Sequence, residues 1–248
     1  MPQPTRRLLF RLTALAPAVA VASALAAGGP GTADSEVDTT DLSLFCDTAL
    51  AYPMRQATAA FRAASGVRVH IFPTAAPLLI PQLLREVQND IIVTSVAQME
   101  AAAAAGLLTG TAIGPWHSPW VLAARRDVTP AAARAGRIAV VDPTGPLRPD
   151  GRAMLPGLGL DPAQAMGVID TREVAPLLSA GTASAGLLHL CEARADRRLQ
   201  VLAMPDVPPL RCAAAISVLV RRPKPEAFLR FLASREATVL LAEAGLAA

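Results

Sequence analysis

The spacing of apolar residues along the chain changes repeatedly between that of a strand and that of a helix. Short alternating runs predict strands, and runs with apolar residues three or four apart predict helices. Gly66 follows one helical run directly, and glycine commonly ends helices because it tolerates a left-handed backbone. In the first half of the chain we predict strands at 42–45, 67–72 and 91–94 and helices at 49–64 and 77–87.

The second half of the chain begins after the segment 114–119, which is rich in turn-forming residues and predicts a crossing point. Beyond it strands and helices alternate again, which is typical of a mostly parallel sheet covered by helices. The pattern predicts strands at 120–124, 137–141, 184–190, 199–203 and 212–220 and helices at 171–180, 225–233 and 234–244.

The first 26 residues have the pattern of a secretory signal peptide. Three arginines precede an apolar stretch at 12–25, which ends in small residues around Ala26. A membrane anchor is the rival interpretation, but the stretch is shorter than the roughly 20 residues of a spanning helix and is interrupted by Pro17. We expect cleavage after Ala26, a flexible lead-in at 27–40 and a periplasmic location.

The charge of the chain is concentrated in this leader. The first 26 residues hold three of the 23 Lys and Arg residues and none of the 20 Asp and Glu residues, so the remainder carries 20 of each sign. Without a basic excess, and with only 4% aromatic residues to stack on bases, nucleic-acid binding has little support. No later stretch has the length and apolarity of a spanning helix, so we expect a soluble, exported protein.

Motifs that would indicate catalysis are absent from the sequence. It contains no Gly-x-Ser-x-Gly, no phosphate-binding Gly-x-x-x-x-Gly-Lys-Ser/Thr, no His-Glu-x-x-His and no Cys-x-x-Cys. The three histidines are too scattered to form a motif. We therefore expect a protein that is not an enzyme and holds no cofactor.

Three cysteines in an exported protein allow one disulfide and leave one free thiol. Cys191 and Cys212 both lie on or beside predicted strands late in the chain, and we predict that they form the disulfide. Cys46 is then the free thiol.

The order of elements resembles the periplasmic molybdate-binding proteins of ABC transporters. The resemblance covers residues 42–246 and rests on the segments at 45–50 (FCDTAL), 89–95, 138–143, 185–189 and 225–237. It implies an α/β, two-lobed periplasmic binding protein type 2 fold in which each lobe is a mostly parallel sheet flanked by helices. Lobe I is expected at 41–118 plus 203–248 and lobe II at 119–202. It also implies a monomeric solute-binding protein that delivers a small ligand to the membrane permease of an ABC importer.

The resemblance also implies a binding site. In the family an oxyanion is held without counter-charges, by hydroxyls and by backbone N–H groups at helix starts, where partial positive charge accumulates. Only one of the matching positions, Thr171, keeps the family's pattern, so we expect molybdate to bind poorly. The positions that match the family's ligand contacts are Ala49, Ala76, Asp150, Thr171 and His189.

Neighbouring residues leave the identity of the ligand open. Asp47 is either an N-cap of the following helix or a carboxylate that opposes a bound anion. Thr48 and Thr74 lie close to the positions of the lost serines, so their hydroxyls are candidates to replace them. Cys46 and His189 are candidate ligands of Zn²⁺ or copper, because thiolate and imidazole suit these ions. A small organic ligand is a further alternative, as is a sensor or scaffold role without transport.

Overall fold

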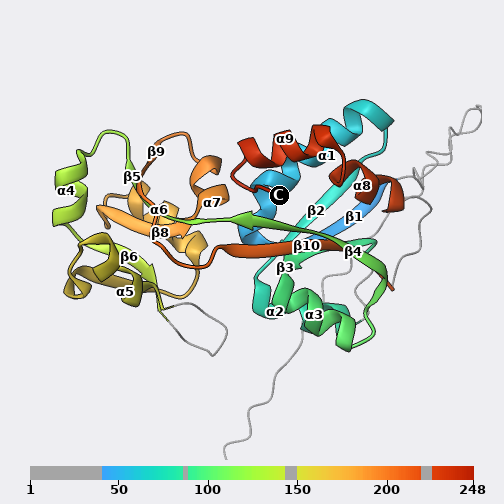
Figure 1. Cartoon of the computed structure of the whole chain (residues 1–248), viewed down its shortest axis with the longest axis horizontal. Helices are drawn as coiled ribbons and strands as arrows, with labels where there is room; N and C mark the ends of the chain where they lie inside the picture. The colour runs from blue at the N-terminus through green and yellow to red at the C-terminus, as the bar shows by residue number, and fades with distance from the viewer. Residues whose placement is uncertain (1–40, 86–88, 143–149, 219–224) are drawn as a thin grey trace, which may run out of the picture. The chain divides into compact units, whose positions relative to one another are not determined.

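The computed structural model describes residues 41–85, 89–142, 150–218 and 225–248. The predicted signal peptide and lead-in lie outside these ranges. The described residues form two five-stranded sheets with helices packed against them (Figure 1). Within the same ranges we find no helix of the length and apolarity needed to cross a membrane.

The first sheet has the strand order β2-β1-β3-β10-β4. β1 is parallel to β2 and β3, and β10 pairs antiparallel with both β3 and β4. β10 alone therefore runs against the other four strands, which confirms a mostly parallel sheet. The strands are β1 (Leu42–Asp47), β2 (Val69–Thr74), β3 (Ile91–Ser95), β4 (Leu108–Ser118) and β10 (Leu210–Ser217).

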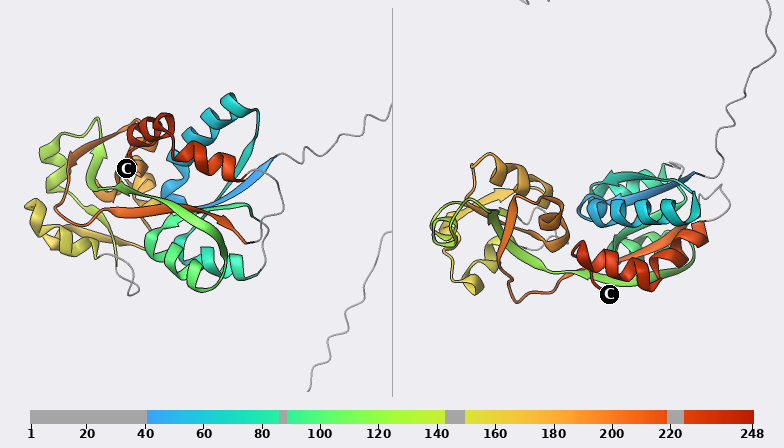
Figure 2. Two further views of the ribbon diagram at one scale, coloured as in Figure 1. Left: turned by 45° about the vertical axis from the view of Figure 1, so that its right-hand side comes forward. Right: turned by 90° about the horizontal axis from the view of Figure 1, so that it is seen from above.

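Helices cover both faces of the first sheet (Figure 2). Because side chains alternate along a strand, one face of β1 buries Leu42, Leu44 and Cys46 against helices on one side. Ile92 of β3 faces the opposite side, where it packs with Leu79. The first side carries α1 (Ala51–Ser65), α8 (Pro225–Leu232) and α9 (Arg235–Glu243), and the second carries α2 (Ala76–Leu84) and α3 (Val96–Ala104).

The second sheet repeats this plan with the order β7-β6-β8-β5-β9. β6 is parallel to β7 and β8, and β5 runs antiparallel to β8 and β9. Its strands are β5 (Trp120–Arg125), β6 (Ile138–Val141), β7 (Ala165–Val168), β8 (Ala185–His189) and β9 (Leu199–Ala203). Its helices are α4 (Pro130–Ala135), α5 (Gly151–Met154), α6 (Val174–Ser179) and α7 (Leu190–Ala195). In the described parts of both sheets' surroundings, the 3-10 turns are η1 (Thr48–Leu50), η2 (Pro156–Leu158), η3 (Pro162–Gln164) and η4 (Thr171–Glu173).

The chain passes from the first sheet to the second at the predicted crossing point 114–119, but most of this segment is strand rather than turn. Residues up to Ser118 belong to β4, an 11-residue strand at the edge of the first sheet. Pro115 has no N–H for a sheet ladder, but proline is tolerated at edges and bulges, and the pairing of β4 with β10 shifts its register between Cys212 and Ala214. The apolar pattern of β4 is weak because most of its residues are exposed or half-buried.

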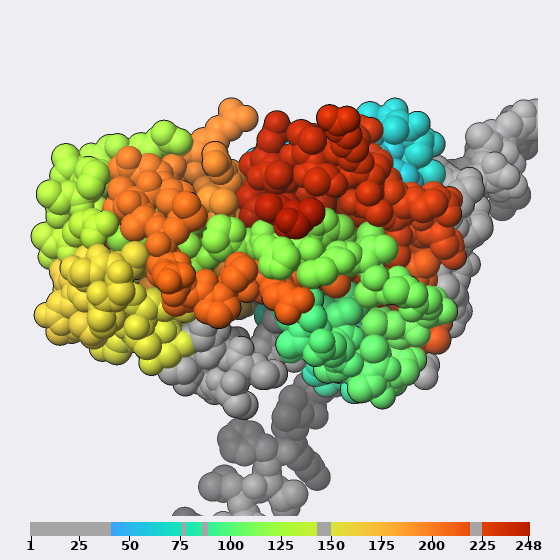
Figure 3. Space-filling view, viewed as in Figure 1, coloured from blue at the N-terminus to red at the C-terminus, as the bar shows by residue number. Residues whose placement is uncertain are grey.

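The C-terminal segment ties β4 to α7. His117 and Ala247 exchange two backbone hydrogen bonds, with N–O distances of 2.6 and 2.9 Å, and Figure 3 shows β4 (green) beside the red C-terminal residues. Gly245 has a φ of +88°, and a Cβ there would lie 2.8 Å from the backbone nitrogen of Cys191. Only glycine allows this close approach to the start of α7.

Candidate ligand-binding site

Three short elements meet where strands of the two sheets end. η1 follows β1, η4 precedes α6, and α7 follows β8. η1 contacts both η4 and α7. Helix starts that gather at the carboxyl ends of strands form the usual ligand position of such α/β folds. We therefore take this junction as the candidate site.

Two carboxylates cap helix starts among the predicted site residues. Asp47 accepts a hydrogen bond from the N–H of Ala49 at 3.1 Å, so it acts as the N-cap of η1. Asp150, which is exposed, accepts from the N–H groups of Arg152 and Ala153 at 3.0 and 3.3 Å at the start of α5. Each carboxylate thus occupies backbone donors that a bound anion would use.

A third carboxylate, Glu192, joins η4 to the start of α7. Its Oε1 accepts the hydroxyl hydrogen bond of Thr171 at 2.7 Å, and its Oε2 accepts from the N–H of His189 at 3.0 Å. Burial raises the pKa of Glu192 to about 7, although both hydrogen bonds act to lower it, and the negative charges of Asp47 and Asp170 raise it further. This carboxyl group changes its charge near neutral pH at the centre of the junction.

Sequence reasoning missed Glu192. Its position offered one signal. A glutamate at the third position of a helix often accepts a hydrogen bond from the backbone N–H of the residue just before the helix. The short α7 hid this signal, since the apolar run at 184–190 was assigned wholly to a strand, whereas β8 ends at His189.

His189 is buried beside Trp120, with ring centroids 4.0 Å apart and an angle of 46° between the planes. Burial lowers the pKa of His189 to about 3, so its imidazole is neutral at physiological pH. Its Nδ1 is buried and has no partner of good hydrogen-bond geometry among the described residues. Both rings line a cavity of about 460 Å³, together with Ser95 and Glu100 of the first sheet's side.

The two threonines proposed to replace lost serines differ in their availability. Thr74 is buried, and its hydroxyl donates to Oε1 of Gln82 at 3.1 Å. The buried hydroxyl of Thr48, in η1, has no hydrogen-bond partner within the described part of the chain. Ala49 is buried beside it, and Ala76 is the first residue of α2. Of these two hydroxyls, that of Thr48 is therefore the one that lacks a hydrogen-bond partner among the described residues.

The surroundings of Cys46 disfavour the predicted metal site. Cys46 points from β1 into the core with Leu42 and Leu44, and burial raises the pKa of its thiol to about 12, which disfavours the thiolate that binds metals. No group of three His, Cys, Asp or Glu side chains suited to a metal ion occurs among the described residues.

The predicted disulfide is also wrong, because all three cysteines are free and buried. The Cys191 thiol donates to the carbonyl of Ala49 at 3.2 Å. The Cys212 thiol donates to the carbonyl of Trp116 at a sulfur–oxygen distance of 3.7 Å. Each thiol thus has a backbone carbonyl as its partner, rather than the other sulfur.

Comparison with known proteins gives one family and many similar folds. The family described as "Bacterial extracellular solute-binding protein" matches residues 42–247. No curated protein matches the chain.

Solved structures resemble the chain over most of its length. The periplasmic molybdate-binding protein of Azotobacter vinelandii has a TM-score of 0.64 and 16% identity over 84% of this chain and 99% of its own. Peb3 from Campylobacter jejuni has a TM-score of 0.62 and 13% identity, and the match covers 84% of this chain and 100% of Peb3. The sulfate-binding protein SubI of Mycobacterium tuberculosis has a TM-score of 0.61 and 17% identity, and the match covers 84% of this chain and 86% of SubI. Identities this low show a shared fold alone, and that fold confirms the predicted type 2 periplasmic binding protein architecture.

Proposed function

The chain belongs to the bacterial extracellular solute-binding proteins of ABC transporters, and we propose that it carries a small organic cation to its importer, rather than a molybdate-like oxyanion. The observation that carries this proposal is Glu192, whose carboxylate takes the hydroxyl of Thr171 and the N–H of His189. These are donors that an oxyanion at this junction would need.

Several features of the predicted site residues oppose a bound dianion. Asp47 and Asp150 already accept hydrogen bonds at two other helix starts. The alanines at positions 49 and 76 lack the hydroxyls of the family's serines, and hydrogen bonds to charged groups contribute about 1.5 to 3 kcal/mol each. Losing two such bonds weakens binding by roughly two to four powers of ten. Repulsion by Asp47 and Glu192 adds to this loss.

The same features favour a positively charged organic group. Burial disfavours the ionised form of Glu192 and raises its pKa, so a cation bound beside this carboxylate stabilises its charge. Trp120 lines the neighbouring cavity together with Glu100 and Arg211, and the face of an indole ring attracts alkylammonium groups. A transition metal has weaker support because Cys46 faces the core.

Calorimetric titration at two pH values tests the proposal. A cation prefers ionised Glu192, so its affinity should rise with pH through the pKa of about 7. Ionisation grows from about 10% at pH 6 to about 90% at pH 8, and amine affinity should rise up to about ninefold. The titrants are a panel of small amines (putrescine, spermidine and choline) and molybdate, whose affinity should fall over the same range.

Two variants complete the experiment. Glu192→Gln should remove the pH dependence and weaken amine binding, whereas Glu236→Gln, at an exposed residue of α9, should leave both unchanged. Submicromolar binding of molybdate at pH 8 would show that the carboxylates do not exclude an oxyanion, and the proposal would be wrong.

A further inference from the structure

Five arginines gather on one surface of the second sheet's helices and turns, which we call the arginine face. Two adjoining hollows of about 540 and 450 Å³ run along this surface and share Arg126 and Arg197 as lining residues. The first hollow lies between the end of β5, α6 and the turn before β9, and the second extends over α7 to Tyr52 and Glu243. The members of the arginine face are Arg125, Arg126, Arg194, Arg197 and Arg198.

Two of these arginines are held by neighbouring carboxylates. Arg125 makes a bidentate pair with Asp127, with both N–O distances at 2.8 Å. Arg198 pairs in the same way with Asp196, at 2.9 and 2.7 Å. These pairs fix the two side chains and leave further guanidinium N–H groups outside the pairs.

The other two central arginines keep their charge uncompensated. Arg126 donates from Nε to the carbonyl of Arg197 at 2.9 Å, which locks its orientation without neutralising it. Within the described ranges neither Arg126 nor Arg197 forms an ion pair. In a chain whose positive and negative residues balance after residue 26, this is a local excess of positive charge.

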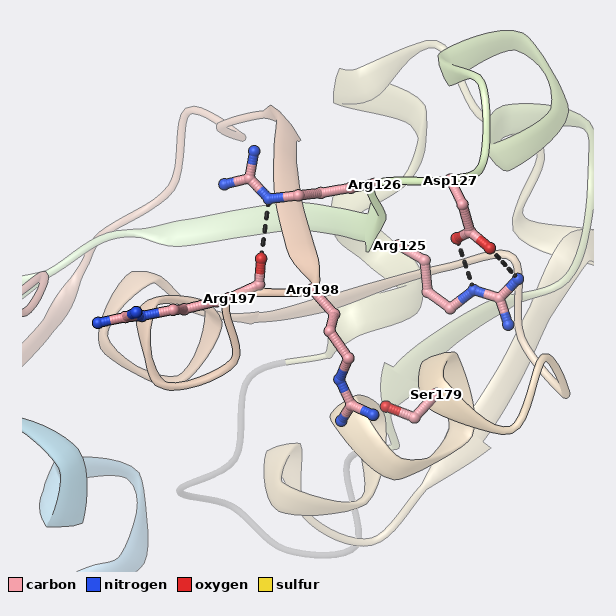
Figure 4. A pocket seen from close by; sticks show the side chains of 6 residues that line it. All are labelled: Arg125, Arg126, Asp127, Ser179, Arg197 and Arg198. Carbon is pink, nitrogen blue, oxygen red and sulfur yellow. Dashed lines mark hydrogen bonds and ion pairs between the residues drawn. The ribbon is translucent and has the colours of Figure 1, made fainter.

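The directions of the side chains indicate the kind of partner. In Figure 4 the guanidinium groups fan apart: Arg126 and Arg197 point to one side, Arg125 turns toward Asp127, and Arg198 turns toward Ser179. A site for one small anion would instead direct its donors at a common point. A spread of fixed, planar guanidinium groups fits several carboxylates on a larger acidic surface.

We propose that the arginine face docks an acidic extracytoplasmic segment of the importer's membrane subunit. The proposal rests on the transport role argued above. The second hollow joins Arg194 and Arg197, beside the second sheet, to Tyr52 of α1 and Glu243 of α9, which pack on the first. A partner bound in this hollow contacts helices of both sheets. Its binding therefore depends on how the two sheets are arranged when the ligand is bound.

Association with the importer in nanodiscs measures docking directly. Arg126→Glu combined with Arg197→Glu should slow association by about tenfold or more and remove most of its dependence on salt. The neutral pair Arg126→Gln and Arg197→Gln should give a smaller effect of the same sign. The control is Arg62→Glu with Arg235→Glu, two exposed arginines on α1 and α9, which should associate like the wild type.

The remaining outcomes separate this proposal from its alternatives. Equal rates for the arginine-face variants and the control would overturn it, as would equal binding of the wild type to nanodiscs of phosphatidylglycerol without the importer. Amine affinity is measured by calorimetry on the same variants and should not change. If the wild type binds no amine but still docks in an arginine-dependent way, the ligand proposal fails and the docking proposal stands.

Discussion

Replacing Glu192 with glutamine should change how the stability of the protein depends on pH. The folded-state pKa of about 7 lies above the ordinary value of 4.5, so the folded state binds this proton more tightly than the unfolded state does. The stabilisation is complete below about pH 4.5 and is lost as pH rises through 7. At about 1.4 kcal/mol per pH unit, the shift corresponds to a loss of about 3 kcal/mol.

Glutamine preserves the local hydrogen bonds without the titration. Its carbonyl oxygen can accept from the N–H of His189, and the hydroxyl of Thr171 can turn to accept from its amide N–H group. The variant should therefore match the wild type near pH 5 and exceed its free energy of unfolding by about 2 to 3 kcal/mol near pH 8.

Urea unfolding at half-unit steps from pH 5 to pH 8.5, followed by circular dichroism, measures this difference. Glu236→Gln serves as the control because that residue is exposed on α9, and its profile should follow that of the wild type. Parallel profiles for wild type and Glu192→Gln would mean that Glu192 titrates at its ordinary pKa, and its assigned place in the junction would then be wrong.

Two further predictions test the core around α7. Gly245→Ala should lower the free energy of unfolding by at least about 2 kcal/mol, because it adds a clash with the backbone of Cys191 to the strain of positive φ. Gly66→Ala, with φ +74° and open space around the added Cβ, should lose only about 1 kcal/mol, and equal losses in urea unfolding would refute the close packing. Burial raises the pKa of Cys46 and Cys191 to about 12 and that of Cys212 also, so Ellman's reagent at pH 8 should find no reactive thiol in the native protein. It should find three after unfolding without reductant, and a smaller number would indicate a disulfide.

The fold was largely predictable because its buried strands are continuous apolar runs. Residues 138–141 are all buried, and a fully buried strand of this kind stands out in a sequence. β4 was missed because an edge strand exposes most of its residues and Pro115 signals a turn. α7 was missed because six residues are too few to display a helical period.

The candidate site was less predictable than the fold. Resemblance pointed to Thr171 at the start of a predicted helix, and the strand-to-helix turn pointed to Asp47 as an N-cap, which the structure has. The resemblance could not indicate that Thr171 bonds to Glu192, 21 residues later in the chain. Nor could composition distinguish a buried Cys46 from a metal ligand, because the face of β1 that a side chain occupies depends on which side the helices pack.

Glu192 gives a common explanation for the positions that depart from the family's pattern of ligand contacts. An oxyanion site that had merely lost its serines would leave the hydroxyl of Thr171 and the N–H of His189 directed at an empty cleft. Here both donate to a carboxylate of the chain itself, so neither donor is left unsatisfied. Under the proposed function, this negative charge at the junction favours a bound cation and opposes a bound anion. We therefore infer that the substitutions at positions 49, 76, 150 and 189 reverse the charge of the preferred ligand rather than erode a molybdate site.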